Sequence, residues 1–257
     1  MKPVSRVDGI LLAVFVASAA VLLFAESEEL VYKTAAAKSI WALGSSWVAF
    51  EAARRLWDVP QARWSWLGIA VGMGLLALGD ASFSFYQVFH GVAHPFPSIA
   101  DVFYVLSYPV LILALLSFVF SYRAVLPLGG TREFAAIAGG AFVVLAVLAV
   151  LGTRPVLEQE APLFEKGLMA SYVWLDVGLV LPLVLLARAA FALRGGALAW
   201  AWGFMLCGFL AMKAADLLYG LTYSLQASSY PYLDEVFYMA SYLLILKGML
   251  VHRRLLT

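Results

Sequence analysis

PSIADVFYVLSY, residues 97–108, returns 134 positions later as PYLDEVFYMASY, residues 231–242. Six of the twelve positions are identical, and Asp101 of the first copy corresponds to Glu235 of the second. Each copy also follows an aspartate that stands inside an apolar run, Asp80 or Asp216. Self-similarity at a fixed interval is typical of a duplicated structural unit. The repeat therefore predicts a unit of at least two helices that occurs twice.

The composition is that of an integral membrane protein. Hydrophobic residues make up 64% of the 257 and charged residues 13%, against roughly 25% charged residues in a soluble domain. Apolar runs long enough to cross a hydrocarbon core of about 30 Å lie near residues 9–25, 35–57, 66–89, 99–122, 134–151, 168–187, 198–223 and 233–250. We therefore expect an all-α, polytopic membrane helix bundle with eight transmembrane helices.

The run at 35–57 is the least apolar of these. It carries Lys38 near its start and Glu51, Arg54 and Arg55 near its end. Long charged side chains can keep their charge in water while their stems lie in hydrocarbon. We expect these side chains to reach the membrane interface in that way.

Lys and Arg are distributed unevenly among the short connections, and this asymmetry sets the orientation. They stand before the first run and after the second, fourth, sixth and eighth runs: Lys2, Arg6, Arg54, Arg55, Arg63, Arg123, Arg132, Arg188, Arg194, Arg253 and Arg254. The remaining connections are mildly acidic or lack Lys and Arg. Both termini are therefore predicted to be cytoplasmic, N-in and C-in.

Four runs fall in each half, so we expect two parallel four-helix repeats, residues 1–125 and 126–257, related by an axis along the membrane normal. Equivalent residues of the two halves should then face each other at one depth. The first run could pass for a signal peptide. We expect it to be retained, because its removal would leave unequal halves.

One face of the run at 66–89 is polar. At 100° per residue its polar and small residues fall within a sector about 80° wide: Asp80, Ser84, Gln87, Gly91 and His94. In the corresponding run of the second half, three residues share a face: Asp216, Gly220 and Tyr223. A helix that continued to His94 would carry polar groups from mid-membrane to the outer surface.

The two repeated stretches each place an acid and two tyrosines on one helix face. These residues are Asp101, Tyr104 and Tyr108 in the first copy and Glu235, Tyr238 and Tyr242 in the second. The proline four residues before each acid suits a helix start, and an acid in the first turn complements the helix dipole. Helix capping is therefore one explanation of the two acids.

Some ionisable residues lie well inside the expected spans: Asp80, Asp176, Lys213 and Asp216. An ionised side chain at a helix centre costs roughly 2.5–3.5 kcal/mol, so each is expected to face the bundle interior or water and to have a partner. Lys213 can pair with Asp216 three residues later or with Asp176 on the preceding helix. A structural Lys–Asp pair that joins two helices would account for these residues without any ligand.

The functional interpretation is a cavity open to the outside, with Asp80 and Asp216 at its floor and the tyrosines on its walls. Tyrosine offers an apolar ring and a hydroxyl, which suits a small amphipathic or aromatic ligand. A structural network of Tyr–Asp hydrogen bonds would produce the same sequence. Both interpretations stay open.

Metal and cofactor chemistry have less support. His90 and His94 are four residues apart and could chelate a metal near Asp101, but no HExxH motif or third external histidine completes the ligand set. Lys213 also allows a retinal Schiff base, against which the eight spans and the tandem repeat count. We assign no catalytic residue and identify no cofactor, and a net charge of +1 gives no reason to expect nucleic acid.

Gly79-Asp80, together with PFPSIADVFYVLSYP at 95–109, resembles the multi-span N-terminal regions of some bacterial and archaeal signalling proteins. In those proteins GD, P-S-x-A-D-x-x-Y and Y-P precede diguanylate cyclase, phosphodiesterase or histidine kinase domains. The match covers roughly residues 79–115 and, more weakly, 215–249. The resemblance implies a sensor in the cytoplasmic membrane of a prokaryote. We expect no output domain in this sequence, so signalling would require a separate cytoplasmic partner.

Three functional hypotheses follow. The first is a non-enzymatic sensor or ligand-binding module with its site in the outer half of the bundle. The second is a small transporter or proton-coupled carrier with a relay of Asp80, Asp176, Asp216 and Lys213. The third is a metal-dependent intramembrane hydrolase that uses His90 and His94. All three place the chain in a lipid bilayer.

Overall fold

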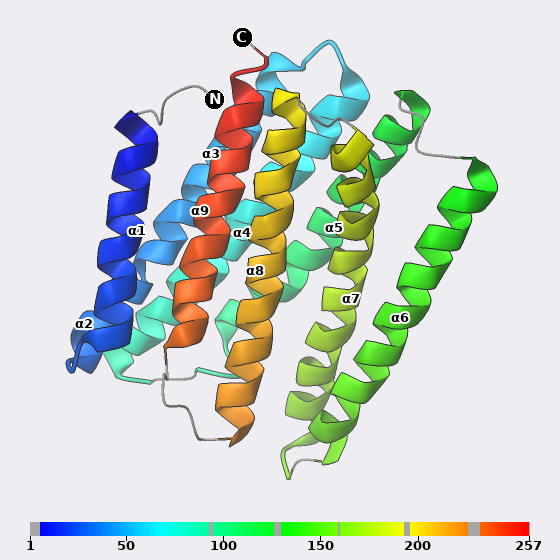
Figure 1. Ribbon diagram of the computed structural model, residues 1–257. Coiled ribbons are helices and arrows are strands. Elements are labelled where there is room, and N and C mark those ends of the chain that lie inside the picture. The colour runs from blue at the N-terminus through cyan, green and yellow to red at the C-terminus, as the bar shows by residue number, and fades with distance from the viewer. Residues whose placement is uncertain are drawn as a thin grey trace.

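The computed structural model describes residues 6–92, 95–125, 130–158, 160–192, 196–225 and 232–256. The described chain is helical apart from short connections (Figure 1). Its helices are α1 (Arg6–Phe24), α2 (Glu28–Ala35), α3 (Ala37–Arg55), α4 (Pro60–His90), α5 (Ile99–Val125), α6 (Thr131–Glu158), α7 (Leu163–Ala192), α8 (Ala197–Leu225) and α9 (Leu233–Arg253). The expected all-α class is confirmed.

Six of the described helices, α4 to α9, are long and apolar enough to cross a membrane. The chain is therefore a multi-pass membrane helix bundle, and it contacts a lipid bilayer. The other two expected spans correspond to α1, whose apolar part is the shorter stretch Gly9–Phe24, and to α3. Length and composition thus support six of the eight expected spans. Helix α3 falls short because it carries serines and Lys38 on faces that point into the bundle.

Six helices of the bundle, α3, α4, α5, α7, α8 and α9, form a ring in which each contacts the next. The hairpins α4–α5 and α8–α9 are joined by α3, which packs on α4 and α9, and by α7, which packs on α8 and α5. Helix α1 lies against α9, and α6 lies against α7 at the opposite edge (Figure 1). Each hairpin is therefore closed by a helix that comes from the other half of the chain.

Glycines let the two hairpins pack tightly. A Cβ atom on Gly72 of α4 would lie 2.5 Å from Leu111 of α5, and one on Gly208 of α8 would lie 2.6 Å from Ile245 of α9. Small residues allow helix backbones to approach closely in membranes. Gly72 and Gly208 are 136 positions apart, as are Asp80 and Asp216. The same packing device therefore occurs in both hairpins.

Large aromatic side chains fill the bundle near the end where α9 finishes. Trp66 of α4 and Trp202 of α8 are each 1% exposed and are also 136 positions apart. The Trp66 ring lies 4.6 Å from the His252 ring of α9, and the Trp202 ring lies 4.9 Å from the Phe118 ring of α5. Because these centroid distances join one hairpin to the other, the hairpins share a single core.

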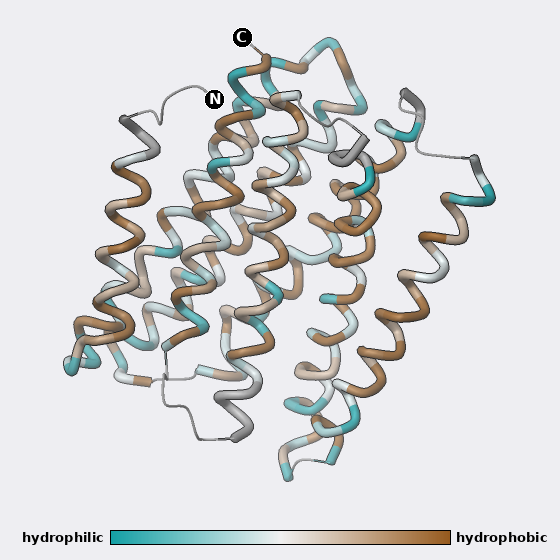
Figure 2. The backbone as a smooth tube through the Cα atoms, viewed as in Figure 1, coloured by the Kyte–Doolittle hydropathy of each residue, from teal (hydrophilic) through white to brown (hydrophobic). Residues whose placement is uncertain are grey.

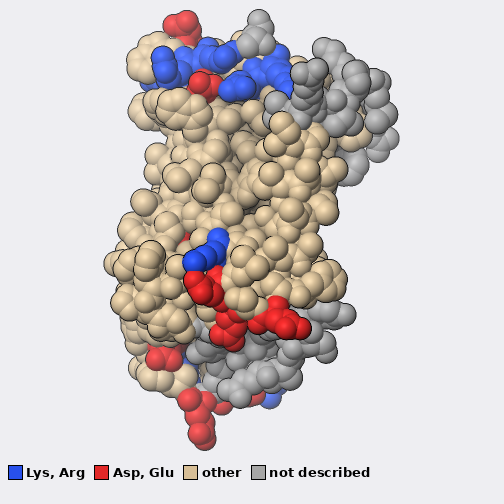
Figure 3. All heavy atoms as spheres, turned by 90° about the vertical axis from the view of Figure 1, so that its left-hand side faces the viewer, with Lys and Arg blue, Asp and Glu red and all other residues tan. Residues whose placement is uncertain are grey.

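The two ends of the bundle differ in charge. Apolar residues dominate the middle of the helices, most evidently in α6 (Figure 2). Figure 3 shows a band of Lys and Arg at one end and more Asp and Glu towards the other. Helix α1 begins and α9 finishes at the basic end (Figure 1). There Arg253 donates to the Glu51 carboxylate at 2.9 Å.

Candidate functional site

Each hairpin holds an aspartate against a tyrosine of its second helix. The Tyr104 hydroxyl donates to Asp80 at 2.8 Å, and the Tyr238 hydroxyl donates to Asp216 at 2.6 Å. Residues of α4 and α8 correspond at a spacing of 136, and those of α5 and α9 at 134. Equivalent residues therefore make equivalent hydrogen bonds, as the repeat suggested.

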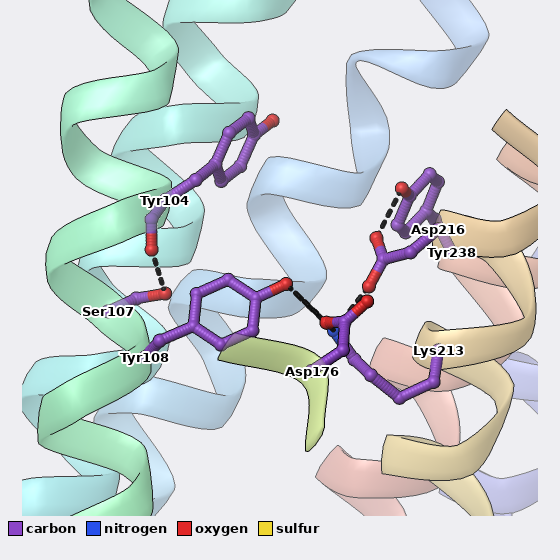
Figure 4. Close-up of polar contacts among 7 residues, drawn as sticks. All are labelled: Tyr104, Ser107, Tyr108, Asp176, Lys213, Asp216 and Tyr238. Atoms are coloured by element: carbon purple, nitrogen blue, oxygen red, sulfur yellow. Dashed lines mark hydrogen bonds and ion pairs between the residues drawn. The ribbon is translucent and has the colours of Figure 1, made fainter. Parts of the chain in front are cut away.

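Lys213, on α8 of the second half, links three helices. Its ammonium group donates to Asp176 of α7 at 2.6 Å, to the Tyr108 hydroxyl of α5 at 3.0 Å, and to Asp216 on its own helix. The Tyr108 hydroxyl in turn donates to Asp176 at 2.7 Å. Figure 4 shows the ammonium group between the two carboxylates, with Tyr108 and Tyr238 directed towards them. Lys213 thus pairs with both of its expected partners.

Lys38 was expected to reach the interface, and this expectation is wrong. Its side chain is 3% exposed, and its ammonium group donates to both carboxylate oxygens of Glu235, at 2.8 and 2.7 Å. The same ammonium group lies 5.1 Å from the ring centroids of Phe83 and Tyr238. Because α3 lies between α4 and α9, Lys38 projects into the bundle. In the sequence, the one sign of a buried base was Glu235, an acid near the start of a span that needs a positively charged partner.

Asp101 is both a capping residue and a bridge between helices. One carboxylate oxygen accepts the Ser98 backbone N–H at 2.7 Å, which caps the start of α5. The other accepts the Tyr172 hydroxyl of α7 at 2.7 Å. Tyr172 stands 134 positions after Lys38, and each serves the first-turn acid of a hairpin in the other half. Sequence reasoning missed Tyr172 because the faint similarity between α3 and α7 concealed this correspondence.

The remaining candidate residues around Asp80 are buried. Tyr242 is 2% exposed and lies beside Asp80, while Ser84 and Gln87 lie one and two turns further along the same face of α4. The second carboxylate oxygen of Asp80 and the Ser84 hydroxyl have no hydrogen-bond partner among the described residues. Asp234, beside Glu235, is a further buried acid that sequence reasoning did not single out.

The carboxylates of the second half are more accessible. The side chains of Asp176 and Asp216 are each 26% exposed, and that of Lys213 is 11% exposed. The carboxylates of α7 and α8 are therefore partly exposed at the surface of the bundle. The side chain of Tyr223 lies outside the described part of the chain.

The expected metal ligands gain no support from the described residues. His90 is exposed, and its ring packs 5.3 Å from Phe85 and 5.8 Å from Tyr86. His94 lies outside the described residues. Within residues 6–92, 95–125, 130–158, 160–192, 196–225 and 232–256, no three His, Cys, Asp or Glu side chains form a group that could hold a metal ion.

A short helix closes the acidic end beside the start of α9. Ser27 caps α2, and the Tyr32 ring of α2 meets the Tyr232 ring edge to face at 6.3 Å. Burial raises the pKa of both hydroxyls, that of Tyr232 to about 12. On the exposed face of the same helix, the hydrogen bond from Lys33 holds the pKa of Glu29 below its usual value. Helix α2 therefore contacts the residue that precedes α9.

A hollow of about 260 Å³ lies at the basic end, away from the polar network, and is lined by Glu51, Arg54 and Arg55.

No protein-family model matches the sequence, and no curated protein or solved structure matches it either. Function therefore has to be inferred from the geometry of the network.

Proposed function

We propose that the chain is an integral membrane sensor or ligand-binding module. Its site is the tyrosine-lined polar network formed by Asp80 and Tyr104 in one half and by Asp176, Lys213 and Asp216 in the other. The observation that carries the proposal is the 26% exposure of Asp176 and Asp216. Acids inside a membrane protein usually face a cavity or a functional pathway.

The tyrosines favour an amphipathic or aromatic ligand. Tyr108 and Tyr238 bring a ring and a hydroxyl to the exposed carboxylates from two different helices. A ligand with a hydrogen-bond donor could bind the carboxylates while its apolar part lies against the rings. When the ligand leaves, the carboxylates and the tyrosine hydroxyls can form hydrogen bonds with each other instead, which would alter the packing of α5 on α7.

The topology that we propose has eight membrane crossings. Helices α1 and α3 run beside the six apolar spans (Figure 1), and Lys38 of α3 is neutralised by Glu235 inside the bundle. The two halves, 1–125 and 126–257, would then be parallel repeats. The band of Lys and Arg (Figure 3) supports cytoplasmic placement of both termini by the positive-inside rule.

The resemblance around Gly79-Asp80 and residues 95–109 favours a role in prokaryotic signalling. We infer that the protein lies in the cytoplasmic membrane and passes its state to a separate cytoplasmic partner. The basic end, with Arg54, Arg55 and Arg253, is the surface that such a partner would meet.

Native mass spectrometry of the mildly solubilised protein tests the ligand site. We expect a stoichiometric mass excess over the chain that is released on denaturation. Tyr108→Phe should retain the ligand about tenfold less well, because one hydrogen bond to a charged group is lost. Tyr86→Phe is the matched control, since the Tyr86 ring packs on His90 outside the network. A bare chain, or equal retention by both variants, would contradict the proposal.

A proton-coupled carrier is the second candidate. Asp176, Lys213, Asp216 and the Tyr238 hydroxyl form an unbroken chain of contacts across α7, α8 and α9. Carriers of this kind usually have discontinuous helices, whereas α5 and α7 continue through Pro109 and Pro182. A pH-sensitive dye inside proteoliposomes should report proton uptake that Asp176→Asn reduces. Uptake equal to that of empty liposomes would eliminate the carrier.

A further inference from the structure

The two equivalent aspartates differ in how their charge is balanced. Asp216 contacts the ammonium group of Lys213, three residues earlier on α8. The residue that stands in the corresponding place on α4, 136 positions before Lys213, is Ala77, which is 1% exposed. Asp80 therefore lacks the cation that its counterpart carries on the same helix.

Among the described residues, Lys38 of α3 attracts the Asp80 carboxylate but is paired with another acid. Lys38 is the nearest base to Asp80, but both oxygens of Glu235 bind its ammonium group, at 2.7 and 2.8 Å. Asp80 is 3% exposed, and its neighbours Tyr104, which donates a hydrogen bond to it, and Tyr242 bring no charge. A buried ionised group that shares its nearest base with another acid is costly, so a positive charge from outside the chain would be favoured there.

A second observation marks the same place. The Ser84 hydroxyl lies one turn from Asp80 on the same face of α4, is 5% exposed, and has no hydrogen-bond partner among the described residues. One oxygen of Asp80 also accepts no hydrogen bond there, and the polar group beside the carboxylate is the Tyr242 hydroxyl. Side chains four residues apart on a helix lie next to each other. The residue equivalent to Ser84 beside the lysine-balanced Asp216 is Gly220.

We propose that Asp80 and Ser84 bind a small monovalent cation such as Na⁺, which occupies the role that Lys213 has in the second half. Oxygen ligands suit hard cations of this kind. One carboxylate neutralises one positive charge, which favours a monovalent ion. The inference rests on the proposed binding function and names a ligand class for its first half.

Thermal unfolding of the purified protein in nanodiscs tests the cation site. NaCl is titrated against N-methylglucamine chloride at constant ionic strength, because screening then stays constant. The melting temperature should rise saturably with Na⁺, since a ligand that binds the folded state stabilises it. Asp80→Asn should abolish the rise, and Ser84→Ala should move its midpoint to at least about tenfold higher NaCl. Ser82→Ala, whose hydroxyl donates to the Leu78 carbonyl within α4, should behave like the wild type.

Exchanging the charge between the halves gives a second test that does not depend on loss of function. Ala77→Lys should remove the Na⁺ dependence by supplying an internal ammonium group, as Lys213 does. Lys213→Ala should add a second Na⁺ dependence, because Asp176 and Asp216 would lose their cation. If Ala77→Lys fails to fold, Lys213→Ala still decides between the outcomes.

The remaining arms separate the sources of positive charge. If methylammonium raises the melting temperature in place of Na⁺, the site binds organic amines, and the inference of a cation site is supported. A melting temperature that responds to pH but not to Na⁺, K⁺ or methylammonium would overturn it in favour of a proton. The groups that face Asp80 in that titration are Lys38 of α3, Tyr104 of α5, and Glu235 and Tyr242 of α9.

Failure of this inference and failure of the proposed function would be distinguishable. A retained organic ligand in a protein that ignores all cations would overturn the cation site and leave the binding module standing. Cation dependence without any retained organic ligand would support the cation site and remove the amphipathic ligand.

Discussion

At the scale of single residues, the buried pair of Lys38 and Glu235 affects stability mainly through the cost of removing one partner alone. Two charges taken out of water gain little when both are present, yet either one alone leaves an uncompensated charge. Both side chains are at most 7% exposed. Their removal should therefore be strongly non-additive.

Lys38→Met alone should lower the free energy of unfolding by about 3–5 kcal/mol, because Glu235 would stay buried without its partner. The double variant Lys38→Met with Glu235→Gln should recover most of that loss. Unfolding in mixed detergent micelles, followed by tryptophan fluorescence, measures both. Lys33→Met is the control, since its pair with Glu29 is exposed and should change nothing measurable. Equal losses in the single and double variants would show that the pair has no such coupling.

The repeat predicted much of the site at this scale. Because the two copies share a spacing, it indicated that Asp80 with Tyr104 and Asp216 with Tyr238 would be equivalent, and the hydrogen bonds agree. It could not identify Lys38 or Tyr172 as partners of the acids. Those contacts depend on which helix lies beside which hairpin, and hydropathy carries no information on that order.

At the scale of helices, the contact between α8 and α9 depends on Gly208. A Cβ atom there would lie 2.8 Å from the Ser241 carbonyl oxygen and 2.9 Å from the Ile245 nitrogen, so backbone would have to move. Gly208→Ala should lower the free energy of unfolding by about 1–3 kcal/mol, the usual cost of overpacking. The melting temperature in detergent measures this change.

The matched variant on the same helix is Gly203→Ala. No atom lies within 4 Å of a Cβ at that position, and alanine favours a helix over glycine by up to about 1 kcal/mol. It should be neutral or slightly stabilising. Similar destabilisation by both variants would mean that helix propensity, and not the α8–α9 contact, determines the effect.

Elements were harder to predict than the fold class. The expected span at 35–57 is α3 in the structure, and α2 precedes it as a separate helix that starts after Ser27. Helix α2 is too short and too polar to produce a hydropathy signal. Helix α3 is polar on its inner face because Lys38 and Ser45 are buried against other helices. Sequence averages cannot distinguish a polar helix in a bundle from a polar helix in water.

At the scale of the whole molecule, the proposed eight-span topology makes a prediction about sidedness. In a background of Cys207→Ser, a cysteine in place of Glu28 or Glu165 should react with an impermeant maleimide in intact cells. A cysteine in place of Asp58 or Arg254 should react only after the membrane is permeabilised. Reaction of positions 28 and 58 from the same side would mean that α3 does not cross the membrane.

The placement of α3 also has a consequence for biosynthesis. Lys38 and its partner Glu235 are 197 residues apart in the chain. At roughly 5–20 residues per second, a ribosome needs about 10–40 s to make the residues between them. During that time α3, the most polar of the long helices, has its ammonium group without the carboxylate of Glu235. In the proposed topology, the ammonium group of α3 therefore needs protection by the insertion machinery or a chaperone until α9 is made.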